Sequence, residues 1–211
     1  MHKIILAALA SIALASCNIA LPGSGPAPDM YELSPKNTFP EGLPNVKWQL
    51  VVEEPIAGEG LNTDRIAVKP TPYELKYFPS SKWSGRAPVL VQTLLIESFE
   101  NSQKIVSVGR RAVGLTGDYV LKTELREFQV ERYGENGEVG VKVRVRLTLK
   151  LVRVASGVIV ASESFERVET AASDKAVDII PAFDEALGGV LKRAVAWTLT
   201  AGQKDWKANR Y

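Results

Sequence analysis

The clearest pattern in the chain is a strict alternation of apolar and polar side chains from Val139 to Leu151. Every odd position in this stretch is Val or Leu, and most even positions carry Lys, Arg or Thr. A period of two residues places the two sets of side chains on opposite faces of a β-strand. The pattern therefore predicts a long strand with one buried face and one solvated, basic face. At 151–152 the alternation changes phase, which indicates a bulge or the end of the strand.

Two neighbouring stretches complete an antiparallel meander around this strand. Residues 118–133 form the preceding strand, and a change of phase near Arg126 predicts a bulge within it. Residues 158–168 form the following strand. The connections are turns at 134–137, where Asn-Gly is typical of a tight hairpin, and at 156–157.

The basic face of the central strand has two explanations. It could bind an anionic ligand, or its cations could pair with carboxylates on the preceding strand. The cations are Lys142, Arg144, Arg146 and Lys150, and the available carboxylates are Glu124, Glu127 and Glu131. Because opposite charges on neighbouring strands stabilise an antiparallel pair, we expect cross-strand ion pairs here rather than a ligand site.

Shorter strands are predicted in the first half of the chain. Prolines at 70 and 72 lie between two of them, and proline has no N–H to donate to a neighbouring strand. We therefore expect this pair of strands at an edge of the sheet. The five predicted strands are residues 31–34, 45–56, 65–68, 72–78 and 105–108.

Helical periodicity appears twice, with apolar side chains three and four residues apart. The first helix extends from about Pro88 to Phe99, and its proline suits a first turn. The second extends from about Val177 to Thr200 and contains Gly188 and Gly189. Because each glycine costs about 1 kcal/mol relative to alanine in a helix, the pair indicates either a close approach to the sheet or a chance weak point.

The N-terminal residues have the features of an export signal. Lys3 precedes an uncharged, apolar run from Ile4 to Ser16, which is shorter than the roughly 20 residues of a membrane span. The run ends in Leu14-Ala15-Ser16-Cys17, which fits the lipobox of bacterial lipoproteins, and Cys17 is the only cysteine in the sequence. We predict a signal peptide at 1–16 and acylation of Cys17, with an ordinary secretory signal as the alternative.

The rest of the chain divides into a tether, one domain and a tail. Residues 17–29 are rich in Pro, Gly, Ser and Ala and predict a flexible tether, with an ordered surface loop as the alternative. Residues 30–202 are enough for one sizeable core, and 203–211 form a polar tail that we expect to fray. Without the signal, 25 basic residues face 24 acidic ones, because Lys3 is one of the 26. A net charge of about +1 does not indicate nucleic-acid binding.

Several kinds of catalytic chemistry are missing from the sequence. The only histidine is His2, inside the predicted signal, so the mature chain has no Ser-His-Asp triad, Cys-His pair or histidine-ligated metal site. The phosphate-binding motif G-x-x-x-x-G-K-[ST] is also absent. We therefore expect no enzyme activity, no cofactor and no metal, with a carboxylate-only enzyme as the alternative.

An ordered series of residues resembles the ABC-type transport auxiliary lipoproteins, the third component of Pqi-type and related Mce-type envelope lipid transport systems. The series begins with Tyr31-Glu32-Leu33-Ser34-Pro35, continues with Asn62–Val68, and ends with a helix that contains Leu187 and Trp197. It covers roughly residues 30–200. The resemblance implies a single α/β domain of the α+β type, with a mixed, largely antiparallel sheet and two packed helices.

The resemblance also implies a non-catalytic role. An inner-membrane permease and ATPase energise transport, an Mce-domain protein forms the conduit, and the lipoprotein docks or bridges this conduit to the membrane. The expected partners are these proteins and the membrane itself, with a homo-oligomer as a further option. The alternative is a periplasmic carrier that holds acyl chains in its own cavity. A carrier needs a large apolar cavity between sheet and helices, whereas a docking subunit should have a filled core.

Four aromatic residues gather in a proline-flanked segment and form the candidate docking surface: Tyr73, Tyr77, Phe78 and Trp83. Aromatic side chains are enriched in binding hot spots because they bury a large area with few rotatable bonds. An edge strand also offers unpaired backbone groups to a partner. The alternative is that these side chains cover the core of the sheet itself.

The residue after the predicted acylation site bears on the destination of the protein. Asn18 follows Cys17, whereas Asp at this position is associated with retention in the inner membrane of enteric bacteria. We therefore expect the periplasmic face of the outer membrane.

Overall fold

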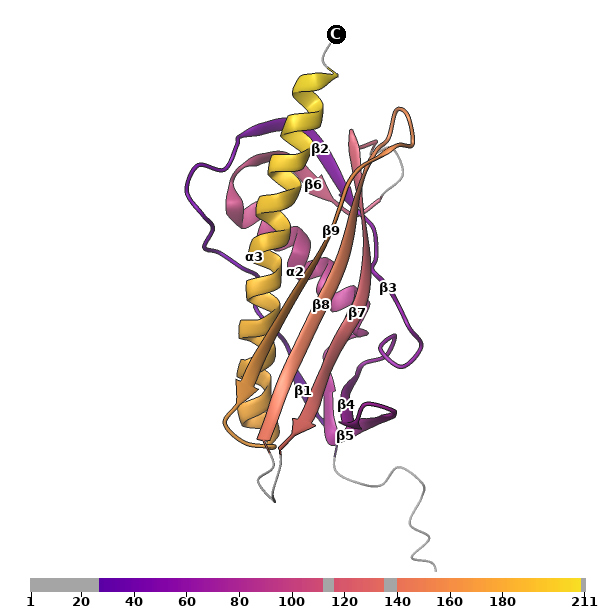
Figure 1. Ribbon diagram of the computed structural model, residues 1–211, viewed down its shortest axis with the longest axis vertical. Coiled ribbons are helices and arrows are strands. Elements are labelled where there is room, and N and C mark those ends of the chain that lie inside the picture. Colours follow the sequence, from indigo (N-terminus) through magenta and orange to yellow (C-terminus); the bar gives the residue numbers. More distant parts are fainter. Residues whose placement is uncertain (1–26, 112–115, 135–139, 210–211) are drawn as a thin grey trace, which may run out of the picture.

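The computed structural model describes residues 27–111, 116–134 and 140–209. They form one nine-stranded mixed sheet and two helices (Figure 1), which confirms the expected single α+β domain. The predicted signal peptide, Cys17, most of the tether and the Asn136-Gly137 turn lie outside the described residues. Among those described, no helix is both long and apolar enough to cross a membrane.

The strands are β1 (Asp29–Tyr31), β2 (Val46–Val52), β3 (Ile56–Ala57), β4 (Arg65–Thr71), β5 (Glu74–Trp83), β6 (Ile105–Gly109), β7 (Tyr119–Tyr133), β8 (Gly140–Arg153) and β9 (Ile159–Ala171), and the helices are α2 (Ala87–Ser102) and α3 (Ala176–Ala208).

The long strand β7 organises the sheet. It pairs antiparallel with β8, which pairs antiparallel with β9, so the predicted meander is confirmed. Along its other edge β7 pairs in parallel with three short strands in succession, β2, β3 and β4. β6 lies beside β2, β5 lies beside β4, and β1 lies beside β5. One 15-residue strand therefore joins the meander to all of the N-terminal strands.

Both predicted bulges are present. The register between β7 and β8 shifts between Leu125 and Glu127, and the register between β8 and β9 shifts at Leu151–Val152. The first shift allows both Leu125 and Phe128 to face the core, although they are an odd number of residues apart.

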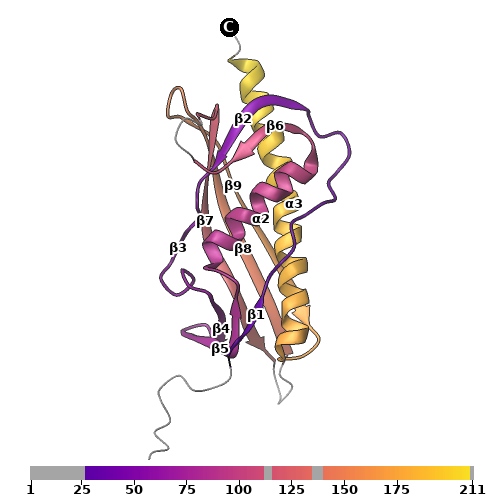
Figure 2. The same cartoon turned by 180° about the vertical axis from the view of Figure 1, so that it is seen from behind.

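The core lies between the apolar face of the sheet and the two helices. The odd positions of β8 from Val141 to Leu151 are all buried against it, as the alternation predicts. α3 packs across β8 and β9, and α2 lies beside α3 (Figure 2). The centroids of the Trp48 and Tyr119 rings lie 5.0 Å apart in an edge-on arrangement in this core. Large side chains therefore fill the space between sheet and helices.

Helix α3 extends well beyond the predicted end at Thr200 and includes residues 203–208, so the expectation that these residues fray is wrong. Asp205 explains the extension, because its carboxylate accepts a hydrogen bond of 2.7 Å from the Tyr119 hydroxyl and pairs with Arg153. The Arg153 contact holds the pKa of Asp205 below its usual value, against the opposing effect of burial, and the Tyr119 bond adds to it. Within the same helix, a Cβ at Gly189 would collide with the Arg167 side chain of β9, whereas a Cβ at Gly188 would make only an ordinary contact with Lys36, so the predicted close approach to the sheet applies to Gly189 alone.

The predicted edge position of the Pro70 segment is wrong, because β4 lies between β5 and β7. Pro70 follows the last residue paired with β7, Lys69, and lies where the β4–β5 register shifts, so its missing N–H costs no pairing. The strand with a free edge is β5, which continues past the predicted end at Phe78. Within the described part of the chain, β1 pairs only with Ser81–Trp83, and this leaves one edge of residues 74–80 open.

Candidate docking groove

A groove of about 620 Å³ is lined by residues of β4, β5, the end of β7 and the start of α3. Strands β4 and β5 lie at the same end of the molecule as the first turns of α3 (Figure 1). The apolar lining of the groove comes from the β4–β5 hairpin, and cations from three separate segments surround it. The apolar residues are Val68, Pro70, Tyr77, Phe78 and Pro79, the cations are Lys76, Arg132 and Lys175, and one carboxylate, Asp174, lies among the cations. A groove with this lining suits an extended segment that carries both apolar and acidic side chains.

The hairpin that carries the aromatic residues has a two-residue turn. Thr71 pairs with Glu74, and Pro72 and Tyr73 form the turn between them. Proline suits the first central position of common turns because its φ is already fixed near the required value. The Tyr73 side chain is 98% exposed at the tip of this turn.

Tyr77 is held in a fixed orientation at the groove. The guanidinium carbon of Arg65 lies 3.6 Å from the centre of its ring, and its hydroxyl donates a hydrogen bond of 3.2 Å to the Gly60 carbonyl. The neighbouring Phe78 is half-buried and packs against the core. Because the Tyr77 ring is already ordered, binding of a partner costs little additional side-chain entropy at Tyr77.

Trp83 does not belong to this surface, so this part of the predicted docking site is corrected. Its side chain is only 1% exposed, and its ring centroid lies 5.3 Å from that of Phe128 and 5.0 Å from that of Phe183. The alternative interpretation, a side chain that covers the core of the sheet, therefore applies to Trp83. The structure brings Tyr73, Tyr77 and Phe78 to one end of the molecule.

The far wall of the groove was not predicted. Arg132 is the next-to-last residue of β7, and Asp174 and Lys175 precede α3. The Arg132 guanidinium lies 3.5 Å from the Asp174 carboxylate, which joins these two segments across the end of the sheet. No local motif marks these residues, because they lie about 50 to 110 residues away from the hairpin along the chain. Across the described ranges, no group of three or more His, Cys, Asp or Glu side chains could hold a metal ion.

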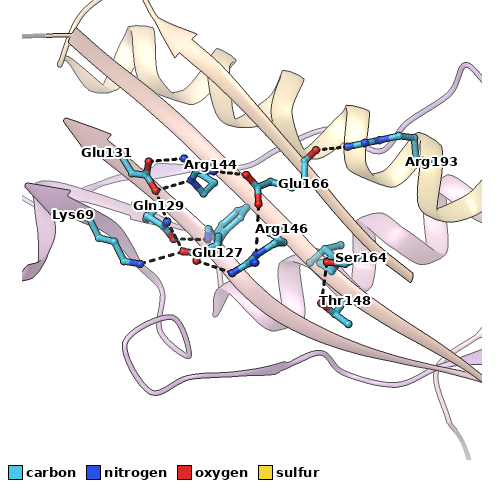
Figure 3. A network of polar contacts seen from close by, with 12 residues as sticks. Lys69, Glu127, Gln129, Glu131, Arg144, Arg146, Thr148, Ser164, Glu166 and Arg193 are labelled. Atoms are coloured by element: carbon cyan, nitrogen blue, oxygen red, sulfur yellow. Dashed lines mark hydrogen bonds and ion pairs between the residues drawn. The ribbon is translucent and has the colours of Figure 1, made fainter. Parts of the chain in front are cut away.

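The face of the sheet opposite the helices carries a network of ion pairs (Figure 3). Glu127 accepts hydrogen bonds from Lys69 at 3.1 Å and from Arg146 at 3.0 Å. Glu131 accepts a bond of 2.8 Å from Arg144, and Gln129 donates to both glutamates. The basic face of β8 is therefore paired with carboxylates of β7, as the sequence predicts.

The same contacts shift the pKa values of the two glutamates. Burial alone would raise the pKa of Glu127 and Glu131, because it disfavours the charged form. At Glu127, hydrogen bonds from Gln129 and Lys69 and the positive charges of Lys69 and Arg146 outweigh burial. At Glu131, hydrogen bonds from Arg144 and Gln129 and the positive charges of Arg144 and Lys142 do the same. Both pKa values therefore lie below the ordinary value of 4.5.

The network should make the stability of the domain depend on pH. A carboxyl group with a lowered pKa in the folded state stabilises it above pH ~4.5, and this contribution disappears as the pH falls through the folded-state pKa. We expect Glu131→Gln to lower the free energy of unfolding by about 1 kcal/mol at pH 7, or roughly 2–4 °C in Tm, and by much less at pH 3. Thermal unfolding of both proteins at the two pH values measures this, and an equal difference at both would contradict it.

Two solved structures share this fold. A protein from Xanthomonas campestris assigned to the family DUF330 is 30% identical, with a TM-score of 0.78 over 84% of this chain and 98% of that one. An uncharacterized protein with 13% identity has a TM-score of 0.56 over 85% of this chain and 99% of its own. The first similarity extends to sequence and structure, and the second supports the fold alone.

Sequence comparisons identify the family. An uncharacterized protein from Bradyrhizobium diazoefficiens is 31% identical over 182 residues, which are 85% of this chain and 47% of the relative. The chain thus spans about half the length of this curated relative. The model of the ABC-type transport auxiliary lipoprotein component family matches residues 31–205, a range that contains the groove and the charged face. The chain therefore belongs to the ABC-type transport auxiliary lipoprotein component family.

Proposed function

We propose that this lipoprotein is a non-catalytic docking subunit, which joins the conduit of a lipid transport system to the membrane that carries its own anchor. In this proposal Cys17 carries the anchor, and an Mce-domain protein, served by a permease and an ATPase, forms the conduit. The observation that carries the proposal is the ordered aromatic groove beside a free strand edge. Family membership supports the association with a transport system.

The free edge of β5 and the groove suit one kind of ligand. Among the described residues, one edge of residues 74–78 has no partner strand, and such an edge can accept an extended segment as an additional strand. Tyr77 and Phe78 then offer apolar contacts, and Lys76 and Lys175 favour acidic side chains. We therefore propose that an extended, partly acidic segment of the Mce-domain protein binds here.

The packing of the core favours docking over the carrier alternative. A carrier that shields acyl chains needs apolar space between sheet and helices, and this space holds the mutually packed rings of Trp83, Phe128 and Phe183. The groove at Tyr77 is open to solvent and lined partly by charged residues. It therefore suits a protein segment better than a whole acyl chain.

We propose the outer membrane as the site of anchoring, because Asn18 rather than Asp follows Cys17. Separation of the two membranes on a density gradient tests this in the native bacterium. The protein should sediment with outer-membrane markers, and its presence only in the inner-membrane fractions would refute this destination.

The docking proposal predicts a specific effect of Tyr77→Ala. Truncation of an ordered interface aromatic typically weakens binding by about 2 kcal/mol or more, which is about 30-fold in Kd. Co-purification with the Mce-domain protein, followed by measurement of Kd, gives the readout. Thermal unfolding of each variant shows whether it is folded.

Phe165→Ala is a matched control for this experiment. Phe165 is also a half-buried aromatic residue with an arginine above its ring, but it lies on β9, outside the groove. It should lose a similar amount of stability and keep normal binding. A Tyr77→Ala protein that remains folded and binds as tightly as the Phe165→Ala control would rule out the groove as the docking site.

A further inference from the structure

We infer that the end of the domain that holds the groove rests directly on the phospholipid headgroups of the anchoring membrane, with Tyr73 at the point of contact. This inference builds on the proposed acylation of Cys17. It adds an orientation and a lipid-binding surface, because anchoring alone leaves the orientation of the domain open.

The length of the tether limits which surface can reach the membrane. Cys17 lies ten residues before Ala27, where the described chain begins, so a fully extended tether spans at most about 35 Å. As a flexible coil it spans roughly 17 Å on average. Two residues after Ala27, β1 begins at Asp29, which pairs with Ser81 of β5. The tether therefore attaches next to Pro79, in the wall of the groove.

The opposite end of the domain lies beyond this reach. Helix α3 begins at Ala176, in the groove, and its last turn lies at the far end of the molecule (Figure 1). Its 33 residues have a length of about 50 Å at 1.5 Å per residue. The hairpin loop between β8 and β9 lies at that far end (Figure 1), and Val158 is its last residue before β9. Even a fully extended tether is shorter than this distance, so the groove end is the one held at the lipid surface.

The charges at the groove end suit phosphate groups. Arg132 lies at the junction of three neighbouring surface grooves. Together they are lined by six cations, of which Lys69, Lys142 and Arg144 pair with Glu127 and Glu131 in the network of the sheet face. The other three, Lys76, Arg132 and Lys175, line the groove itself. Lys76 and Arg132 also form exposed ion pairs, which are weak and exchange readily for other anions. Lys76, Arg132 and Lys175 are therefore the cations that anionic headgroups can attract.

Exposed apolar side chains surround these cations. Tyr73 projects from the hairpin turn, Val177 lies in the first turn of α3, and Tyr133 lies at the end of β7 beneath the Lys142 ammonium group. Tyrosine is enriched at the boundary between lipid and water, because its ring is apolar and its hydroxyl is polar. Together with the cations, these side chains form a surface suited to headgroups. The docking groove would then open at the lipid surface, where a conduit delivers or receives lipid.

The experiment uses the acylated full chain on vesicles of phosphatidylethanolamine and phosphatidylglycerol in a ratio of about 3:1. Cys17 is the only cysteine and its sulfur is acylated, so one introduced cysteine gives a unique site for an environment-sensitive fluorophore. Tyr73→Cys carries the probe at the groove end, and Val158→Cys carries it at the far end as the matched control. Both side chains are exposed, so neither substitution should disturb the core. Vesicle-bound protein is isolated by flotation, and lipids with nitroxide headgroups act as the quencher.

We expect the probe at position 73 to be quenched severalfold more strongly than the probe at 158. Adding Lys76→Glu and Lys175→Glu should reduce the quenching at 73 in these anionic vesicles. Equal quenching at both positions, stronger quenching at 158, or none at 73 would overturn the inference. None of these results would contradict the docking proposal. That proposal fails instead if the Tyr77→Ala protein is folded and keeps normal affinity for the Mce-domain protein.

Discussion

Replacing Trp83 by alanine is expected to lower the free energy of unfolding by about 3–5 kcal/mol, because a large buried side chain is removed and a cavity remains. The Trp83 ring packs between Phe128 of β7 and Phe183 of α3, so it joins the N-terminal strands to the meander and the helix. For a domain of this size the loss corresponds to a decrease in Tm of roughly 6–20 °C. Thermal unfolding followed by circular dichroism measures it.

Tyr73→Ala is the control within the same segment. Its side chain is almost fully exposed, so we expect its free energy of unfolding to stay within about 0.5 kcal/mol of the wild type. The two substitutions thus separate the core aromatic of β5 from the surface aromatic of the turn. Equal stability of the Trp83→Ala and wild-type proteins would contradict the position assigned to Trp83.

Replacing Cys17 by serine is expected to abolish lipid attachment. The diacylglyceryl chain is transferred to a thiol, which serine lacks, and each buried methylene of an acyl chain contributes about 0.8 kcal/mol to membrane binding. The variant should incorporate no fatty-acid probe in growing cells, and it should be found either as released soluble protein or as precursor that keeps its uncleaved signal. Undiminished labelling of the Cys17→Ser protein would contradict the proposed anchor.

The anchoring prediction has a control that keeps the cysteine. Asn18→Ala leaves the lipobox intact and should be labelled as strongly as the wild type. If both variants lose the label, the effect comes from disturbed export and not from the missing thiol.

The parts of the fold that could be predicted from sequence are those with local repetition. The alternation in β8 shows directly which side chains are buried, and each phase change marks a bulge that the structure contains. The charge pairs between β7 and β8 were predictable for the same reason, since neighbouring strands of a hairpin place opposite charges side by side. The Lys69 contact to Glu127 was not, because it joins strands 58 residues apart in sequence.

Features that depend on distant contacts were predicted wrongly or not at all. Prolines suggested an edge at β4, but the register shift between β4 and β5 removes the need for the Pro70 N–H. The polar composition after Gly202 suggested fraying, but Arg153 and Tyr119 stabilise the last turns of α3 through Asp205. In both cases the stabilising partner lies far away in the sequence.

In the candidate site, too, the features set by local sequence could be predicted and those set by distant contacts could not. Aromatic residues and prolines correctly marked the β4–β5 hairpin as unusual, since it supplies most of the apolar lining of the groove. The sequence pattern could not separate Trp83 from Tyr77, because the bulge that precedes Trp83 places the two side chains in different environments. Arg132 and Lys175 reach the groove only through the tertiary fold.

Site-specific photo-crosslinking in intact cells tests the central claim, that the groove end docks the conduit, most directly. A photoreactive amino acid replaces Lys76 in the groove or, as the control, Val158 at the far end. Docking at the groove predicts a covalent adduct with the Mce-domain protein from position 76 and none from position 158. An adduct from position 158 combined with none from position 76 would contradict it.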